Sequence, residues 1–202
     1  FTFAVHMPII GLVLVPALLH WPVLLLPVHI VLLELLIDPA CSIVFEAEPE
    51  SADIMTRPPR LLSASPFAAV NLTYAVVQGT GMAALLLLGH GVLVGQGASE
   101  TQSRVAVFTG LVLGVCLLIL SNRDLSRPAI MGLAANNPWI MRMFAAVGLL
   151  LAAVIAVPFL RGVMGFAPAG ALELVAGLAL LAGLGLWLET LRRLGGLLLP
   201  EE

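Results

Sequence analysis

The chain contains no lysine and little charge of either sign. Only 10% of its 202 residues are Asp, Glu or Arg, against roughly 25% in soluble domains. All nine basic residues are Arg, and the formal net charge is −3. The sequence therefore has no basic patch that would indicate a nucleic-acid-binding surface. With 60% apolar residues and a mean hydropathy of +1.09, the composition excludes a disordered tail, a nucleic-acid binder and an ordinary soluble enzyme. It predicts an all-α polytopic membrane protein whose first partner is the lipid bilayer.

Cysteine is also scarce. Cys41 and Cys116 are isolated from each other and form no Cys-x-x-Cys pair, so nothing indicates a disulfide framework or a thiolate metal site. The glycine-rich stretches have no Walker-type spacing, and no nucleotide site is predicted.

Long apolar stretches predict a six-helix transmembrane bundle that forms a single domain over residues 1–202. A membrane-spanning helix needs about 20 residues, and polar or Pro- and Gly-rich segments separate six such stretches. Because the chain starts at Phe1 and shows no signal-peptide pattern, we expect it to be part of a longer protein. The expected spans are about 1–19, 24–45, 66–89, 104–121, 139–160 and 170–190.

The placement of arginine predicts the orientation of the bundle. Arginines gather in loop 46–65, in loop 122–138 and in the C-terminal tail, whereas the opposite side has only Arg104 and Arg161. By the positive-inside rule, loop 46–65 and the C-terminus are expected in the cytoplasm, and the protein is expected to be a multi-pass protein of the cell membrane.

Two carboxylates in the second expected span are the strongest candidates for functional residues in the sequence. Glu34 and Asp38 lie deep in an apolar run, where a charged side chain costs several kcal/mol, at least about 2.5–3.5 for Asp on insertion scales. Their spacing of four residues places them on one helix face, where two carboxylates would repel each other in a low dielectric. A bound cation would remove that repulsion, as would a shared proton. In the alternative structural reading, both groups are protonated and hydrogen-bonded to neighbouring helices.

A proline next to this pair favours the cation reading. Pro39 has no N–H, so the carbonyl of Leu35 loses its helical donor, and we expect a broken helix whose freed oxygen can help to hold a cation. Ser42 is one further turn along the same face. Such oxygen ligands suit hard cations, for example Ca²⁺ or Mg²⁺.

The first expected span repeats this pattern more weakly. His6 lies in that span, and Pro8 frees the carbonyl of Ala4. A hairpin would place His6 beside the second span, where it could be a ligand, a proton carrier or a structural donor. We therefore take Glu34, Asp38 and His6 as the candidate metal ligands, and we predict no catalytic or cofactor-binding residue.

Other polar and small residues receive structural interpretations. His29 is expected near the outer interface, and His90 is expected in a solvated loop over residues 90–103. Arg104 is expected to extend along its span to the interface. Small residues that allow close helix packing are expected at Gly110 and Gly114, and at Gly79 and Gly81.

Three segments together resemble a known family. They are Leu26-Pro27-Val28-His29-Ile30, then Glu34-Leu35-Leu36-Ile37-Asp38-Pro39-Ala40, then Asp53-Ile54-Met55-Thr56-Arg57-Pro58-Pro59-Arg60. This arrangement resembles the C-terminal transmembrane domain of P-type cation-transporting ATPases, in a bacterial variant close to the type II pumps. Within that resemblance, Asp38 matches an aspartate ligand of the calcium pumps, and Glu34 stands where those pumps carry Asn.

The resemblance implies both a role and a set of missing parts. The six spans would be the last six of ten membrane helices, and the domain would supply part of the cation path of an ATP-driven pump. Its partners would be the N-terminal remainder of the pump, with the first four membrane helices and the actuator, phosphorylation and nucleotide domains, together with the transported cation. ATP and Mg²⁺ would act only through those domains, because this chain lacks the ATP-hydrolysing site. From the residues alone, a free-standing channel, a proton-coupled secondary transporter or a structural membrane module remain alternatives.

Overall fold

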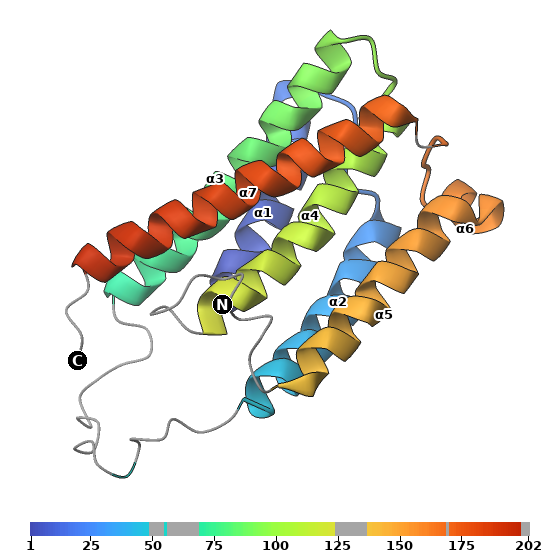
Figure 1. Ribbon diagram of the computed structural model, residues 1–202. Coiled ribbons are helices and arrows are strands. Elements are labelled where there is room, and N and C mark those ends of the chain that lie inside the picture. Colours follow the sequence, from blue (N-terminus) through green and yellow to red (C-terminus); the bar gives the residue numbers. More distant parts are fainter. Residues whose placement is uncertain (49–54, 56–68, 124–136, 169, 199–202) are drawn as a thin grey trace.

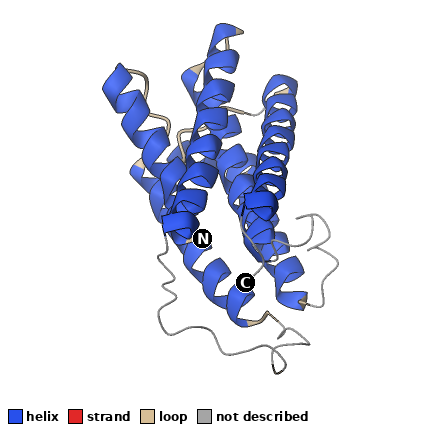
Figure 2. Ribbon diagram, turned by 90° about the vertical axis from the view of Figure 1, so that its left-hand side faces the viewer, coloured by secondary structure: helices blue, strands red, loops and turns tan. Residues whose placement is uncertain are grey.

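The chain forms a bundle of α-helices, shown in Figures 1 and 2. The computed structural model describes residues 1–48, 55, 69–123, 137–168 and 170–198, and no strand occurs in these ranges. The helices are α1 (Thr2–Leu19), α2 (Pro27–Glu46), α3 (Ala69–Gly95), α4 (Glu100–Arg123), α5 (Pro138–Ala156), α6 (Pro158–Val163) and α7 (Ala171–Leu198).

Most of these helices have the length and composition of membrane spans. Within the described residues, α1, α3, α4, α5 and α7 are each long and apolar enough to cross a bilayer. The remaining long helix, α2, has 20 residues and an apolar described part over Pro27–Ile37. The predicted all-α polytopic class is confirmed.

Helix α4 is the centre of the bundle. It packs against α3 and α7, and also contacts α1, α2 and α5. In its most apolar stretch 72% of the residues are buried, against 17% to 39% in the four other candidate spans. Helices α2 and α5 run side by side along one flank of α4 (Figure 1). Helix α2 has little contact with α1, although a short connection joins them.

Glycines allow the closest approaches between helices. A Cβ atom added to Gly79 would lie 2.5 Å from the carbonyl oxygen of Ala4, so α1 and α3 pack backbone to backbone there. A Cβ atom added to Gly81 would lie 2.1 Å from the ring of Trp187 in α7. The two glycines therefore serve two different neighbours, because a step of two residues turns about 200° around a helix.

The turn between α3 and α4 is shorter than the sequence predicts. We expected a loop over 90–103, but α3 continues to Gly95 and α4 begins at Glu100. The prediction that His90 is a solvated loop residue is wrong: its side chain is buried in α3, and Nδ1 lies 2.6 Å from the Ser103 hydroxyl. Glycine-rich composition suggested a loop, but neighbouring helices override the weak helix propensity of glycine.

Prolines and an asparagine set the ends of α5. Asn137 caps its N-terminus by accepting a hydrogen bond from the Trp139 N–H, and Pro138 occupies the first helical position. The expected span over 139–160 is interrupted, because Pro158 disfavours a helical conformation at Val157 and then starts α6.

Candidate functional site

The structure brings two of the three predicted ligand residues together. His6 on α1 and Glu34 on α2 face each other, with 3.5 Å between His6 Nε2 and Glu34 Oε1. The other ring nitrogen of His6, Nδ1, lies 2.8 Å from the carbonyl oxygen of Thr2, one turn earlier in the same helix. The residues are 28 positions apart in the chain, and the α1–α2 hairpin closes that separation.

The hydrogen bonds of His6 indicate that a positive charge can lie beside its Nε2 atom and the Glu34 carboxylate. A carbonyl oxygen only accepts, so Nδ1 must carry the hydrogen that it donates to Thr2. In the neutral imidazole, Nε2 then presents a lone pair toward the Glu34 carboxylate. Two acceptors 3.5 Å apart repel each other unless a proton or a cation lies between or beside them. The pair can therefore contribute one nitrogen and one carboxylate to a shared cation.

One side of this pair is open. The side chains of His6 and Glu34 are 40% and 41% exposed, and the apolar residues next to Glu34 on α2, Val31 and Leu35, are exposed as well. A membrane would place either lipid or another helix on that side, and lipid cannot solvate a carboxylate. We therefore expect a polar group from another helix to cover the exposed side of the His6–Glu34 pair.

The third predicted ligand is placed only by the backbone. Asp38 lies on α2 one turn after Glu34, so the two share a helix face. The side chains of residues 38–42 lie outside what the structure describes, and Ser42 is among them. Within the side chains that are described, no three His, Cys, Asp or Glu residues gather as a metal site.

One expectation about a freed carbonyl needs correction. Helix α2 runs from Pro27 to Glu46 as one helix, so Pro39 does not break it as predicted. A proline removes one hydrogen bond, and the bonds on either side are sufficient to keep the helix continuous. Helix α1 is likewise continuous through Pro8, and the carbonyl of Ala4, which Pro8 deprives of a donor, lies beside Gly79 on α3.

A comparison with protein families now gives this geometry its context. The family model described as "Cation transporting ATPase, C-terminus" matches residues 22–194, which is most of the chain. The chain belongs to this family. As a cation-ATPase C-terminal domain, it is the membrane part of a cation-transporting ATPase, and the predicted resemblance is confirmed. A comparison with curated proteins gives no match.

The family match includes the acidic helix of this cation-ATPase domain. Glu34 and Asp38 both fall inside residues 22–194, whereas His6 and most of α1 precede the match. The contact between His6 and Glu34 is therefore a feature of this structure that the family match does not itself describe.

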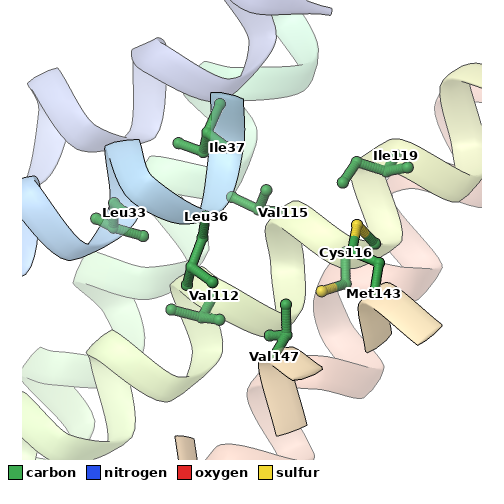
Figure 3. Close-up of a pocket in the computed structure, with 9 residues that line it drawn as sticks. All are labelled: Leu33, Leu36, Ile37, Val112, Val115, Cys116, Ile119, Met143 and Val147. Atoms are coloured by element: carbon green, nitrogen blue, oxygen red, sulfur yellow. The ribbon is translucent and has the colours of Figure 1, made fainter. Parts of the chain in front are cut away.

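An apolar pocket of the cation-ATPase domain lies on another side of α2 (Figure 3). Leu33, Leu36 and Ile37 of α2 line it together with residues of α4 and α5, and every lining residue is apolar. These side chains offer no oxygen or nitrogen ligand to a hard cation such as Ca²⁺ or Mg²⁺. The pocket shows instead that α2 presents apolar residues to α4 and α5 and its carboxylate to α1.

The sequence missed the role of His29. This residue is fully buried, with ring centroids 4.8 Å from Phe108 and 5.1 Å from Phe166. Its Nδ1 accepts a hydrogen bond from the Leu26 N–H at 3.1 Å, so Nε2 must donate the second one, to the Met164 carbonyl at 2.9 Å. The residue caps α2 and ties it to the turn before α7. The three-residue offset to Leu26, at the start of a helix, was the only signal in the sequence.

Replacing His29 by Leu is expected to lower the stability of the complete protein by about 1–3 kcal/mol, because the buried Met164 carbonyl and the partly buried Leu26 N–H lose their partners. A fluorescence-monitored thermal unfolding scan of the detergent-solubilised protein would measure the change. His29→Gln keeps one donor and one acceptor and should lose less. Equal unfolding temperatures for wild type and His29→Leu would show that the capping role is wrong.

Proposed function

We propose that this domain supplies part of the cation-binding site of an ATP-driven cation pump, with Glu34 and Asp38 as carboxylate ligands and His6 as a third contributor. The observation that carries the proposal is the contact between His6 Nε2 and the Glu34 carboxylate on two adjacent helices of a cation-ATPase domain. An ionisable pair within apolar helices is costly unless it has a task. Family membership favours the pump over a free-standing channel, a secondary transporter or a structural module.

The donor set of the site indicates what must complete it. Hard divalent cations take about six to eight oxygen ligands, and two carboxylates with one imidazole supply fewer. The open side of the His6–Glu34 pair supports further ligands from membrane helices outside this domain, which we assign to the first four helices of the pump. Two carboxylates favour a divalent cation such as Ca²⁺ or Mg²⁺, and the imidazole extends the range to softer metals.

ATP would act on this site from a distance. In the proposed pump, phosphorylation in domains outside this chain tilts α1 and α2 and changes the separation of their ligands. Since Glu34 and His6 sit on different helices, a small relative movement changes the affinity for a cation held between them. Access would then alternate between the two sides of the membrane.

The arginine distribution supports a cytoplasmic location for loop 46–65 and the C-terminus. Arg123 and Glu48 pair at one end of the bundle, while Arg104 lies at the other. The end with Arg123 is also the end from which loops 46–65 and 122–138 leave the helices. We therefore assign this end to the cytoplasmic side.

A cation panel on the complete pump tests this function. Purified protein in lipid vesicles is assayed for ATP hydrolysis with Ca²⁺, Mn²⁺, Zn²⁺, Na⁺ and K⁺ in turn, at constant Mg·ATP, while Mg²⁺ and pH are varied separately. We expect one cation class to stimulate hydrolysis in a saturable manner, with uptake or release of the same cation. If no cation alters hydrolysis and none moves across the vesicle membrane, the proposal is wrong.

A further inference from the structure

The outer end of α2 is fastened by an arginine from α4. The guanidinium of Arg104 donates to the carbonyl of Val23, from Nη2 at 2.8 Å and from Nε at 3.3 Å, and Nη1 donates to the carbonyl of Gly165 at 2.9 Å. Val23 belongs to the connection that leads into α2, and Gly165 to the turn before α7. The donors of Arg104, which is expected to extend to the interface, are thus engaged by backbone carbonyls of two other segments.

The inner end of α2 is fastened by the arginine at the opposite end of α4. Arg123 binds the Glu48 carboxylate with both Nε, at 2.8 Å, and Nη2, at 2.5 Å, and its side chain is only 3% exposed. Asn137 completes the junction, because its Nδ2 donates to Glu48 Oε2 and to the Val44 carbonyl, each at 3.2 Å. A forked arginine–carboxylate pair of this kind fixes direction as well as distance.

The two arginines stand on one stiff element. They are 19 residues apart on α4, a separation of about 28 Å at 1.5 Å per residue, which is close to the thickness of the hydrocarbon core of a bilayer. Helix α4 is the most buried candidate span, enclosed by α3 and α7 on one flank and by α2 and α5 on the other. Helices packed in this way resist bending, because every displacement disturbs several interfaces.

The middle of α2 is packed on one face, where Leu33, Leu36 and Ile37 lie against α4 and α5, and open on the face that carries Glu34. Helix α2 makes little contact with α1, and Val31 and Leu35 are exposed next to the half-exposed Glu34. We propose that α4 is a strut whose terminal residues Arg104 and Arg123 hold both ends of α2 at a fixed separation, so that Glu34 moves only through bending or rotation of the middle of α2. Both arginines are positioning residues in this arrangement.

The strut has a consequence for transport, and this part rests on the proposed function. If both ends are held, α2 cannot slide across the membrane with its carboxylate, and the ligand geometry at Glu34 depends on both fastenings at once. Loosening either end should then weaken the cation site, although each arginine is about 14 Å along the helix axis from the midpoint between the two.

Hydrogen–deuterium exchange on the complete pump tests the strut without relying on transport. Arg104→Gln is expected to speed exchange of residues 20–27 by about tenfold, and Arg123→Gln that of residues 43–48 by a similar factor, because each variant loses charge-assisted hydrogen bonds. The decisive result is in the centre: both variants should also speed exchange of residues 31–38. Glu48→Gln removes the forked charge pair while keeping Arg123, and serves if Arg123→Gln does not fold.

Matched controls come from two other arginines near span ends. Arg142→Gln removes a cation that lies 4.7 Å from the ring centroid of Trp139 on its own helix, and Arg161→Gln alters α6; neither should change exchange in α2. Arg104→Lys keeps the charge but loses the fork, and should fall between wild type and Arg104→Gln. If each substitution loosens only its own end, or neither end, the strut is overturned.

The cation response separates the strut from the pump proposal. We expect the cation concentration for half-maximal stimulation to rise several-fold in both Arg104→Gln and Arg123→Gln, and to stay unchanged in the two controls. An unchanged value in both variants contradicts the strut. If the wild type itself responds to no cation, the proposed function fails, and the exchange of residues 31–38 alone decides whether the strut stands.

Discussion

Replacing Gly79 by Val is expected to destabilise the complete protein by about 1–3 kcal/mol, the usual cost of overpacking a closely packed interface, or more. A Cβ atom at this position would lie 2.5 Å from both the Ala4 carbonyl oxygen and the Met7 Cβ. Both obstacles belong to the backbone or its first side-chain atom, so they cannot swing aside as a flexible side chain would. Helices α1 and α3 must separate. Thermal unfolding followed by tryptophan fluorescence would measure the loss.

The same substitution should also change the geometry of the candidate site. His6 lies between Ala4 and Met7 on α1, so a shift of this segment changes its distance to Glu34. We expect Gly79→Val to weaken cation stimulation as well as stability. Gly91→Val is the matched control, because it lies on the same helix and a Cβ atom there would meet nothing within 4 Å. Equal unfolding temperatures for the two variants would contradict the backbone-to-backbone packing of α1 and α3.

The sequence was sufficient for the class of fold and for one contact of the site. Charge depletion and apolar runs follow directly from the lipid environment, so the all-α membrane bundle could be predicted from composition. Glu34 stood out because a carboxylate in an apolar run is costly. Its meeting with His6 could be expected from the hairpin, since a short connection places α1 and α2 in one neighbourhood.

The partners of the other polar residues could not be predicted, because they depend on contacts across the bundle. His29 meets the Met164 carbonyl 135 positions away, and Arg123 meets Glu48 75 positions away. No local pattern encodes such pairs. Their common feature, visible only in the structure, is that each contact lies at a helix end and joins segments far apart in the sequence.

Local rules also failed where packing overrides propensity. Glycine content suggested a loop around His90, and a proline suggested a break in α2, yet both segments are helical. Pro158, in contrast, does end α5. After Pro158 the chain begins a new helix, α6, so the end of α5 leaves no segment unpaired. Helix α2, in contrast, is held at both ends by hydrogen bonds from Arg104 and Arg123, which favour a continuous helix.

Glu34→Gln is expected to raise strongly the cation concentration at which phosphorylation of the complete pump is half-maximal, because it removes a negative charge from the site while keeping the size of the side chain. His6→Asn should raise the cation concentration for half-maximal phosphorylation by about tenfold, a typical loss when a group that orients a ligand is removed. Asp38→Asn should behave like Glu34→Gln if the shared helix face places both carboxylates on the cation. Phosphorylation from ATP at graded cation concentrations would measure all three.

The coupling between His6 and Glu34 makes this experiment specific to their contact. Because both groups would serve the same cation, the double variant should be no worse than Glu34→Gln alone, a departure from additivity that indicates direct interaction. Glu46→Gln is the matched control, since Glu46 is an exposed carboxylate at the end of the same helix. A Glu34→Gln pump with wild-type stimulation would remove Glu34 from the cation site. Strictly additive losses would instead place His6 and Glu34 at separate steps, and the 3.5 Å contact would then have no role in holding the cation.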